Sequence, residues 1–338
     1  MKKIALITGI TGQDGAYLAQ FLLGFKYEVY GFASRRVNQT YENLDYLKIT
    51  DKIKIIFGDI TDPSSVNNAV KTSRPHEVYN LAAMSFVGLS WQEPIHTANV
   101  DGIGALYLLE AVKNYAPDAR VYQASTSEMY GNNWEDDFSQ NELTPFRPRS
   151  PYGSAKVFAH NTMINYRESF GIRTSCGILF NHESPIRGKE FVTRKITDGV
   201  AQIKMGLSDH IELGNLEPKR DWGFAGDYVK AMWLMLQKNK PQDFVIATGK
   251  YINVKEFINL VAKKLNVNIL WKGKGIKEKA YMNGEIIIEI DKKYFRPNEV
   301  DFLQGNALKA KKILGWKPQY SINSLIDEMI QKESENIV

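Results

Sequence analysis

Short apolar runs alternate with helical segments along the first half of the chain. Residues 4–8, Ile-Ala-Leu-Ile-Thr, form a continuous apolar run that ends at a glycine, which is typical of a strand buried on both faces. Four similar runs follow, at residues 28–32, 53–57, 77–81 and 120–124. The segments between them carry apolar side chains at helical spacing, at residues 12–25, 63–71 and 101–115. Strands joined by helices predict βαβ crossovers, and these produce a parallel sheet with helices on both faces.

The pattern changes after residue 180, where glycine and proline become frequent and the apolar runs shorten. Helices are predicted at residues 191–205, 225–237 and 322–332, whereas residues 271–290 show no clear period. We therefore predict an α/β protein with a Rossmann-type doubly wound parallel sheet in residues 1–180. A smaller C-terminal α/β substrate-binding domain is predicted in residues 181–338, with some segments crossing back to the first domain.

Composition narrows the classes of protein that remain. The 338 residues are 43% hydrophobic, which supports a sizeable core and excludes a disordered chain. The net charge of +5 is not gathered in a basic stripe, so we expect a small anionic ligand and no nucleic acid. One cysteine, Cys176, and scattered histidines predict neither a disulfide nor a metal site. No apolar stretch approaches the ~20 residues that span a bilayer, so we expect a cytoplasmic protein without membrane association.

A glycine-rich segment directly follows the first predicted strand and opens the first predicted helix: Gly9-Ile10-Thr11-Gly12-Gln13-Asp14-Gly15. Glycines there allow a tight turn and let backbone N–H groups approach a pyrophosphate at the helix N-terminus. Their spacing is three-three, whereas the dehydrogenase fingerprint has two-three spacing. The segment predicts a dinucleotide site, and a plain strand-to-helix turn is the alternative.

The residues after the next strands indicate which dinucleotide binds. Arg35 and Arg36 stand where a site that prefers NAD places an acid for the ribose diol. Two guanidinium groups suit a 2′-phosphate, so we expect NADP, the alternative being a solvated arginine pair. Adenine and ribose are expected beside two strand ends, Asp59-Ile60 and Leu81-Ala82-Ala83.

Candidate catalytic residues lie further along the chain. Tyr152 and Lys156 are four residues apart and share one face if the segment is helical. We expect the ammonium group and a nicotinamide's positive charge to lower the phenol's pKa toward neutrality. Such a tyrosinate can take a hydroxyl proton while hydride leaves the same carbon. A Tyr-x-x-x-Lys pair alone also fits a surface helix, but this one follows a glycine motif and the segment Ser125-Thr126-Ser127-Glu128.

Together these motifs resemble the extended short-chain dehydrogenase/reductase family, and within it the GDP-mannose 4,6-dehydratase branch, over nearly the whole chain. The segments that carry the resemblance are GITGQDG at 9–15, YQASTSE at 122–128, PRSPY at 148–152, NYRES at 165–169, GILFNHESP at 177–185, FVTRK at 191–195, RDWG at 220–223 and YFRPNEVD at 294–301. Sugar-nucleotide 4-epimerases share the Tyr/Lys pair but lack an acid two residues after the Ser/Thr position. Glu128 therefore favours elimination over epimerisation.

The resemblance implies a three-stage reaction on GDP-mannose with tightly bound, recycled NADP. Tyr152, with Lys156 beside it, is expected to deprotonate the C4 hydroxyl as hydride passes to NADP⁺, and Thr126 to hydrogen-bond the same oxygen. Because the 4-ketone acidifies C5, Glu128 can remove the C5 proton and assist departure of the C6 hydroxyl as water. Hydride then returns to C6 while C5 is reprotonated, and the product is a 4-keto-6-deoxy sugar nucleotide.

By the same resemblance, further residues are expected to hold the ligands. Ser85 is expected between cofactor and sugar, and His182 and Arg187 near the nicotinamide-side phosphate. The predicted grip on GDP is Asn181, Lys195, Arg220, Arg296 and Glu299. A homodimer or homotetramer is also implied, with an interface through helices near residues 101–115 and 152–170.

The chain departs from the branch at several positions. Val37-Asn38 replace a Ser-Ser pair that usually contacts the 2′-phosphate, which weakens the expectation of a tetramer. Met84 and Arg147 replace the usual Gln and aromatic residue near the hexose, so GDP-manno-heptose is an alternative substrate, for dehydration or for C4 oxidation alone. Segments 132–140 and 273–288 are longer than expected. A nucleotide-sensing protein without catalysis is the alternative from another class.

Overall fold

Seven parallel strands form the large sheet of the computed structural model, which describes residues 2–35, 40–134 and 137–335. Their order is β3-β2-β1-β4-β5-β6-β11. The strands are β1 Ile4–Thr8, β2 Glu28–Ala33, β3 Lys54–Phe57, β4 Glu77–Asn80, β5 Arg120–Thr126, β6 Arg173–Leu179 and β11 Phe244–Ile246. The five strands predicted from apolar runs are thus confirmed to within two residues. The order reverses direction between β1 and β4, where open α/β sheets form their ligand crevice.

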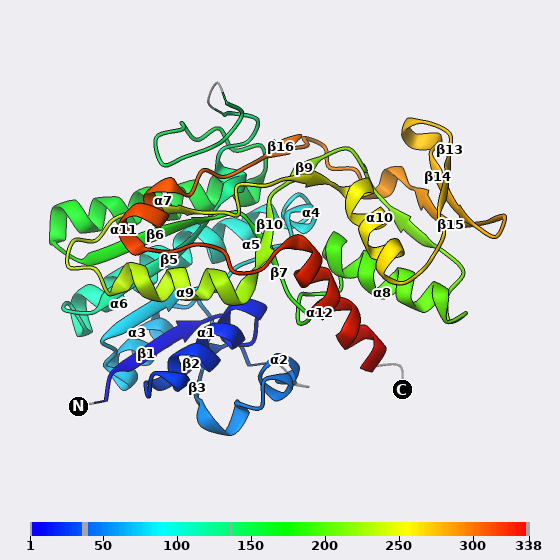
Figure 1. The fold of residues 1–338 in the computed structure, drawn as a ribbon. Coiled ribbons are helices and arrows are strands. Elements are labelled where there is room, and N and C mark those ends of the chain that lie inside the picture. The colour runs from blue at the N-terminus through cyan, green and yellow to red at the C-terminus, as the bar shows by residue number, and fades with distance from the viewer. Residues whose placement is uncertain (1, 36–39, 135–136, 336–338) are drawn as a thin grey trace.

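Helices cover both faces of this sheet, as the βαβ pattern predicts (Figure 1). Side chains alternate along each strand, so Ala5 and Ile7 face one layer while Leu6 faces the other. The first layer contains α1 (Gln13–Gly24), α9 (Ala225–Leu236) and α11 (Leu308–Leu314). The second contains α3 (Pro63–Ser73), α6 (Gly104–Tyr115) and α7 (Pro151–Phe170). The predicted class, a doubly wound Rossmann-type sheet, is therefore confirmed.

Short elements fill the connections between the longer helices and strands. They are α2 Glu42–Tyr46, α4 Val87–Ser90, α5 Pro94–Ala98, a π-helical turn at Asn99–Ile103, and 3₁₀ turns at Thr50–Lys52, Ser127–Met129, Gly275–Lys277 and Lys292–Tyr294. The helix predicted from residue 101 thus begins with the π turn, and regular α6 starts at Gly104.

The smaller part of the molecule is built from α8 (Val192–Lys204), α10 (Val254–Lys264), α12 (Ile322–Glu335) and three short sheets. Figure 1 shows α8, α10 and a β hairpin on one side of the molecule, with α12 running between them and the large sheet. The short sheets comprise β7 Asn181–Glu183 with β10 Trp222–Phe224; β9 Lys219–Arg220 with β12 Ile252–Asn253 and β16 Phe302–Leu303; and β8 Ile211–Leu213 with β13 Leu270–Lys272, β14 Lys279–Met282 and β15 Glu285–Ile290. Segment 271–290, which has no clear period in the sequence, is largely this hairpin.

The second half of the chain returns to the large sheet. β11 extends the sheet beyond β6, and α9 packs against α1 on the opposite face from α6. The division of the chain at residue 180 remains a prediction, because the structure interleaves segments from both halves.

Buried polar contacts hold α8, α12 and the loop at residues 185–187 together. Arg194 on α8 forms an ion pair with Glu333 on α12, and the two side chains are 4% and 1% exposed. The same guanidinium donates to the carbonyl oxygens of Pro185 and Arg187, at 2.5 and 3.0 Å. Helix α12 therefore supports the loop that carries Arg187. Within the described residues, no helix is long and apolar enough to cross a membrane.

Segment 132–140 packs along the chain that follows residue 300. The Asn132 amide donates to the Asp301 carboxylate at 2.6 Å and accepts from the Asp301 backbone N–H at 2.8 Å. Gln140 exchanges backbone hydrogen bonds with Gln304 and Asn306. The segment thus holds the strand β16 region, which follows Glu299, against the rest of the molecule.

Candidate active site

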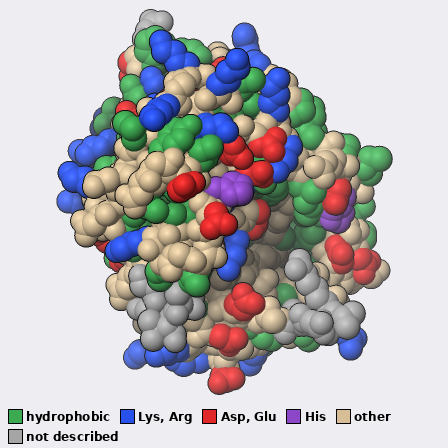
Figure 2. Space-filling view, turned by 90° about the vertical axis from the view of Figure 1, so that its right-hand side faces the viewer, with side chains coloured by type: hydrophobic (Ala, Val, Ile, Leu, Met, Phe, Trp, Pro, Cys, Tyr) green, Lys and Arg blue, Asp and Glu red, His purple; other side chains and the backbone are tan. Residues whose placement is uncertain are grey.

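A cavity of about 1220 Å³ lies at the carboxyl ends of β1, β2, β4 and β5 and extends to the smaller part of the molecule. Figure 2 shows one face of the molecule with a hollow bordered by both basic and acidic side chains. All of the predicted site residues that the structure describes line the cavity, except Arg35. The topology therefore brings together residues from positions 9 to 299.

The glycine loop has the shape that a dinucleotide needs. Gly9 has a φ of +68°, and a Cβ atom there would lie 2.8 Å from the backbone nitrogen of Ala82. A Cβ atom on Gly15 would lie 2.4 Å from the Gly9 carbonyl oxygen. Gly12 caps α1 without a side-chain hydrogen bond, so the first turn presents backbone N–H groups to the cavity. These residues fit a bound pyrophosphate.

Two side chains of the first turn of α1 hold the smaller part of the molecule. Asp14 accepts a 2.7 Å hydrogen bond from Nε2 of His182, and Gln13 bonds both the His182 carbonyl and the Ser184 hydroxyl. Burial alone would raise the pKa of Asp14, but the charge of His182 brings it below its ordinary value. Burial alone would lower the pKa of His182, and Asp14 instead raises it. His182 thus contacts the glycine loop through Asp14.

Of the two arginines predicted to select NADP, the structure describes Arg35. Arg35 is exposed and does not line the cavity, although its neighbour Ser34 does. Arg36 lies outside the described residues. Asp59 lines the cavity, and its carboxylate accepts from the Thr61 backbone N–H at 2.8 Å. Ile60 and the segment Leu81-Ala82-Ala83 also line it, as predicted.

Tyr152 and Lys156 lie one turn apart at the start of α7, which confirms the predicted helix. Ser150 caps this helix by accepting from the Gly153 N–H at 3.0 Å, and Pro151 occupies its first position. Both side chains are buried, at 8% and 2% exposure. The Lys156 ammonium donates to the Ala124 carbonyl at 3.1 Å and lies 5.7 Å from the centre of the Tyr152 ring.

The expected fall in the pKa of Tyr152 is not found in the protein chain itself. Burial raises the pKa of Tyr152, and the charge of Asp101 raises it further, while a hydrogen bond with Thr126 opposes the rise. The Lys156 ammonium does not offset this rise because it is directed toward Ala124 and Asp101. That Lys156 and a nicotinamide's positive charge together bring the pKa of the phenol toward neutrality stays a prediction, because these effects come from protein groups alone.

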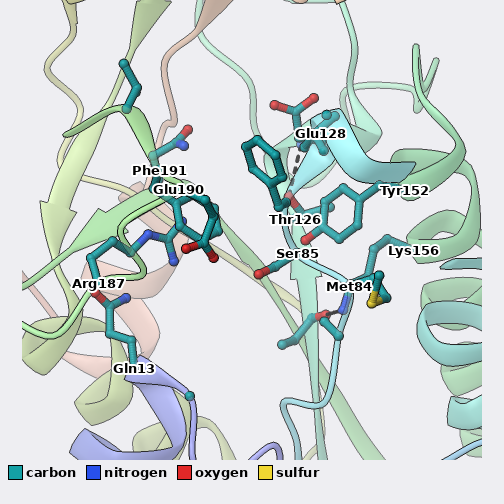
Figure 3. A pocket seen from close by; sticks show the side chains of 18 of the residues that line it. Gln13, Met84, Ser85, Thr126, Glu128, Tyr152, Lys156, Arg187, Glu190 and Phe191 are labelled. Carbon is teal, nitrogen blue, oxygen red and sulfur yellow. Dashed lines mark hydrogen bonds between the residues drawn. The ribbon is translucent and has the colours of Figure 1, made fainter. Parts of the chain in front are cut away.

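Thr126 and Glu128 lie beside this pair. Thr126 ends β5, and its hydroxyl accepts from the Glu128 backbone N–H at 3.2 Å, which fixes the turn that carries the carboxylate. Figure 3 shows Ser85, Thr126, Tyr152 and Lys156 along one wall of the cavity, with Glu128 at the end of that wall. Thr126 and Glu128 are 8% and 7% exposed. A base and a separate carboxylate thus face one space.

The predicted nucleotide-binding residues lie where the smaller part of the molecule meets this wall. Arg220 is buried beside Glu299, with 3.1 Å between Nη2 and Oε1, and burial lowers its pKa. Arg296 lies 3.4 Å from Glu299 and 3.6 Å from Glu128. Lys195 lies over the ring of Tyr294, 3.9 Å from its centre, and Asn181 also lines the cavity. Their roles toward a nucleotide remain predictions.

Several lining residues were not anticipated from the sequence. The rings of Phe86 and Phe191 meet edge to face across the two parts of the molecule, with 5.8 Å between their centres. The Arg187 guanidinium lies 3.5 Å from the centre of the Phe191 ring, and Glu190 lines the same wall (Figure 3). Phe86 directly follows Ser85, and Phe191 begins the FVTRK segment. Their positions beside predicted site residues were the only indication in the sequence that they line the cavity.

The two departures suspected near the hexose differ in position. Met84 lines the cavity beside Ser85. Arg147 is exposed and does not line the cavity, because its backbone is bonded to Met129 on the outer side of the 3₁₀ turn. The influence of Arg147 on the choice of sugar stays a prediction. A group of possible metal ligands, His210, Glu212 and Glu289, lies elsewhere, and its carboxylates pair with Lys293 and Lys279.

The sheet order, with a glycine loop at its switch point and a buried Tyr–Lys pair beside it, defines the Rossmann-fold class of the extended short-chain dehydrogenase/reductases. Solved structures of this fold include a UDP-glucose 4-epimerase from Thermotoga maritima, with a TM-score of 0.83, 23% identity, and coverage of 99% of this chain and 100% of that one. Another is a dTDP-glucose 4,6-dehydratase from Bacillus anthracis in complex with NAD, with a TM-score of 0.81, 21% identity, and coverage of 99% and 97%.

Sequence comparison identifies the branch. The family model for GDP-mannose 4,6 dehydratase matches residues 6–329. A GDP-mannose 4,6-dehydratase of Vibrio cholerae is 47% identical over 355 aligned positions, which cover 99% of this chain and 94% of that protein. The chain belongs to the GDP-mannose 4,6-dehydratase family, and its enzyme class is that of the hydro-lyases.

Proposed function

We propose that this chain converts GDP-mannose to GDP-4-keto-6-deoxymannose by 4,6-dehydration. The observation that carries the proposal is the position of Glu128, a buried carboxylate in the same cavity as Thr126, Tyr152 and Lys156. Oxidation at C4 needs only the Tyr–Lys pair, whereas elimination of water needs a second acid–base group. A protein that only senses nucleotides has no use for these four groups together.

The glycine loop, the first turn of α1, Asp59 and the Leu81–Ser85 segment are proposed to hold a nicotinamide dinucleotide. The close backbone approaches at Gly9 and Gly15, and the first turn of α1, which has no side-chain cap, support this fit. Bound there, the cofactor would accept a hydride from the sugar and return it within one turnover. We infer NADP rather than NAD from Arg35, which is exposed at the end of β2 and free of a described acidic partner within 4 Å, together with Arg36.

The protein residues would transfer protons to and from the sugar and hold its C4 oxygen. Tyr152 takes the proton of the C4 hydroxyl, and the Thr126 hydroxyl hydrogen-bonds that oxygen. Lys156 keeps a positive charge behind the phenol, and Glu128 removes the C5 proton. Protonated Glu128 then gives its proton to the departing C6 hydroxyl, so that water leaves and the carboxylate is regenerated.

The cations in the smaller part of the molecule are proposed to bind the diphosphate. Arg220, Arg296 and Lys195 converge on the cavity, and Glu299 lies between the two arginines. Guanidinium groups bind phosphate through paired, charge-assisted hydrogen bonds. Glu299 would orient both arginines and accept from ribose or guanine donors.

GDP-manno-heptose remains the second candidate substrate, favoured by Met84, which lines the cavity beside Ser85. The deciding experiment is mass spectrometry of the purified protein after incubation with each sugar nucleotide and catalytic NADP⁺. Loss of one water from GDP-mannose supports the proposal. Reaction with the heptose alone transfers the assignment to that substrate. Loss of two hydrogens without loss of water, in an amount no greater than the NADP⁺ supplied, indicates C4 oxidation only. No change in either sugar would overturn the enzymatic proposal.

We also propose a homo-oligomer that pairs through α6 and α7. Apolar side chains are exposed at and near these helices: Tyr115 at 44%, Phe158 at 43% and Phe170 at 56%. Ile95 on the adjoining α5 is 77% exposed. Sedimentation of the wild-type protein beside Phe158→Glu tests this surface, since a charge there should release monomers.

A further inference from the structure

Asp101 is a buried carboxylate behind the wall of the cavity. It is 1% exposed, lies in the π-helical turn between α5 and α6, and does not line the cavity itself. Its two oxygens accept from the backbone N–H of Met84, at 3.1 and 3.3 Å. Its Oδ1 also lies 3.7 Å from the Lys156 ammonium. One carboxylate therefore contacts both the Met84–Ser85 turn and the lysine of the Tyr–Lys pair.

The local backbone holds Asp101 in this position. Single π turns inside helices widen the backbone and occur frequently at functional sites. A Cβ atom on Gly102 would lie 3.3 Å from the Phe158 ring and 3.5 Å from the Ala155 carbonyl, so the turn packs closely against α7. A Cβ atom on Gly104 would lie 2.8 Å from the side chain of Ile60. The glycines on either side leave the turn little room to move away from Lys156.

Asp101 affects the pKa values of Lys156 and Tyr152 through its charge. Burial raises the pKa of Asp101 to about 6, although Lys156, the Met84 amide and His96 each favour the ionised form. Burial lowers the pKa of Lys156, and Asp101, followed by Asp14, opposes this fall. The charge of Asp101 also raises the pKa of Tyr152; Glu128 raises this pKa as well, and Arg187 lowers it. Removal of the Asp101 charge should therefore lower the pKa of both Lys156 and Tyr152.

We propose that Asp101 is a positioning residue for the reaction: it keeps Lys156 charged and fixes the Met84–Ser85 turn that lines the sugar side of the cavity. It acts through these neighbours and does not touch the cavity contents. The predicted effect of Asp101 on turnover rests on the proposed function. Its predicted effect on NADPH binding rests only on the contacts of Asp101 with Lys156 and Met84.

Asp101→Asn tests the proposal, since the amide oxygen can still accept from the Met84 N–H but carries no charge. The expected result is a pH profile of turnover displaced to lower pH by roughly one unit, because both limbs follow pKa values that Asp101 holds up. Asp118→Asn, the same change at an exposed site, should leave the profile in place. A loss of turnover that is uniform across pH would overturn the proposal and leave Asp101 a structural role.

A second readout does not depend on the sugar substrate. The affinity of the protein for NADPH, followed by nicotinamide fluorescence, should decline as pH rises and Lys156 loses its proton. In Asp101→Asn this decline should begin at a lower pH than in wild type. With Lys156→Arg, whose guanidinium stays charged, Asp101→Asn should no longer move this profile. If wild type binds NADPH but does not dehydrate GDP-mannose, the proposed function fails while this assay still decides on Asp101. Equal NADPH profiles in wild type and Asp101→Asn would overturn the inference.

If Asp101→Asn does not fold, the comparison of wild type with Lys156→Arg takes its place. The NADPH affinity of wild type should then show an alkaline decline that Lys156→Arg lacks. An equal alkaline decline in Lys156→Arg would show that a group other than Lys156 titrates there, and would overturn the proposal.

Discussion

The guanidinium of Arg296 lies 3.6 Å from the carboxylate of Glu128 and 3.4 Å from that of Glu299. One arginine from the segment after β15 thus contacts both the candidate acid–base residue and the candidate nucleotide-binding residue. A bound diphosphate would compete with both carboxylates for the same guanidinium.

Substitution of Arg296 by methionine separates these two contacts. If its main partner is the diphosphate, KM for the sugar nucleotide should rise about 10–100-fold with a smaller change in kcat, since charge-assisted hydrogen bonds are lost. Arg296→Lys should recover part of the affinity. Steady-state kinetics decide the matter, because a fall in kcat at unchanged KM would instead assign Arg296 to Glu128.

Substitution of Glu128 by glutamine should stop dehydration but spare oxidation. We expect 4-keto-6-deoxy product to fall by about 10²–10⁴-fold, the usual range for an acid–base group. Reduced cofactor should still accumulate on the enzyme, visible by its near-ultraviolet absorbance. Glu168→Gln, an exposed carboxylate on α7, is the matched control. Full turnover by Glu128→Gln would remove Glu128 from the mechanism.

The Asp14–His182 pair should stabilise the fold in a limited pH range. The pKa of Asp14 is lowered by His182, so its contribution is present above the ordinary aspartate range and is lost as pH falls through the lowered pKa. The pKa of His182 is raised by Asp14, so its contribution is present below the ordinary histidine pKa and is lost as pH rises through the raised pKa. Asp14→Asn should therefore cost about 1–3 kcal/mol at mildly acidic pH and less at alkaline pH.

Urea unfolding across that pH range measures the effect of Asp14→Asn. Asp51→Asn, at an exposed site, should change the free energy of unfolding little at any pH. A deficit in Asp14→Asn that is the same at acidic and alkaline pH would show that the charge pair is not its cause.

The buried pair Arg194–Glu333 should be costly to break from one side. Glu333→Gln leaves a guanidinium at 4% exposure without its counter-charge, and we expect a loss of about 3–5 kcal/mol. The double variant Arg194→Met/Glu333→Leu should recover much of that stability, because apolar side chains replace both charges. Asp327→Asn breaks the more exposed pair with Lys264 and should cost under about 1 kcal/mol. Thermal unfolding ranks the variants, and equal losses for the two pairs would contradict this account.

Cys176 should resist modification in the folded protein. The thiol is fully buried, and burial raises its pKa well above the ordinary value, so little thiolate forms. Iodoacetamide should react only after unfolding in urea. Rapid alkylation of the native protein would show that β6 opens readily to solvent.

Local patterns were enough to predict much of this protein. The apolar run at residues 4–8 identified β1 because a strand buried on both faces needs continuous apolar side chains. The segment at residues 9–15 predicted the tight strand-to-helix loop, because only glycine tolerates the close backbone approaches found at Gly9 and Gly15. The four-residue spacing of Tyr152 and Lys156 placed both on one turn of α7. Each of these features depends on neighbours in the chain.

The tertiary structure alone decided which distant charges meet. Asp101 contacts Lys156, His182 contacts Asp14, and Arg296 contacts Glu128 across 55, 168 and 168 positions of the chain. The pKa of Tyr152 likewise depends on burial and on Asp101, so its rise was not apparent from the nearby Lys156. The β hairpin at residues 279–290 also forms through pairing with β8 and not from a local period. Electrostatic interactions depend on distance and burial, and only the folded chain determines both.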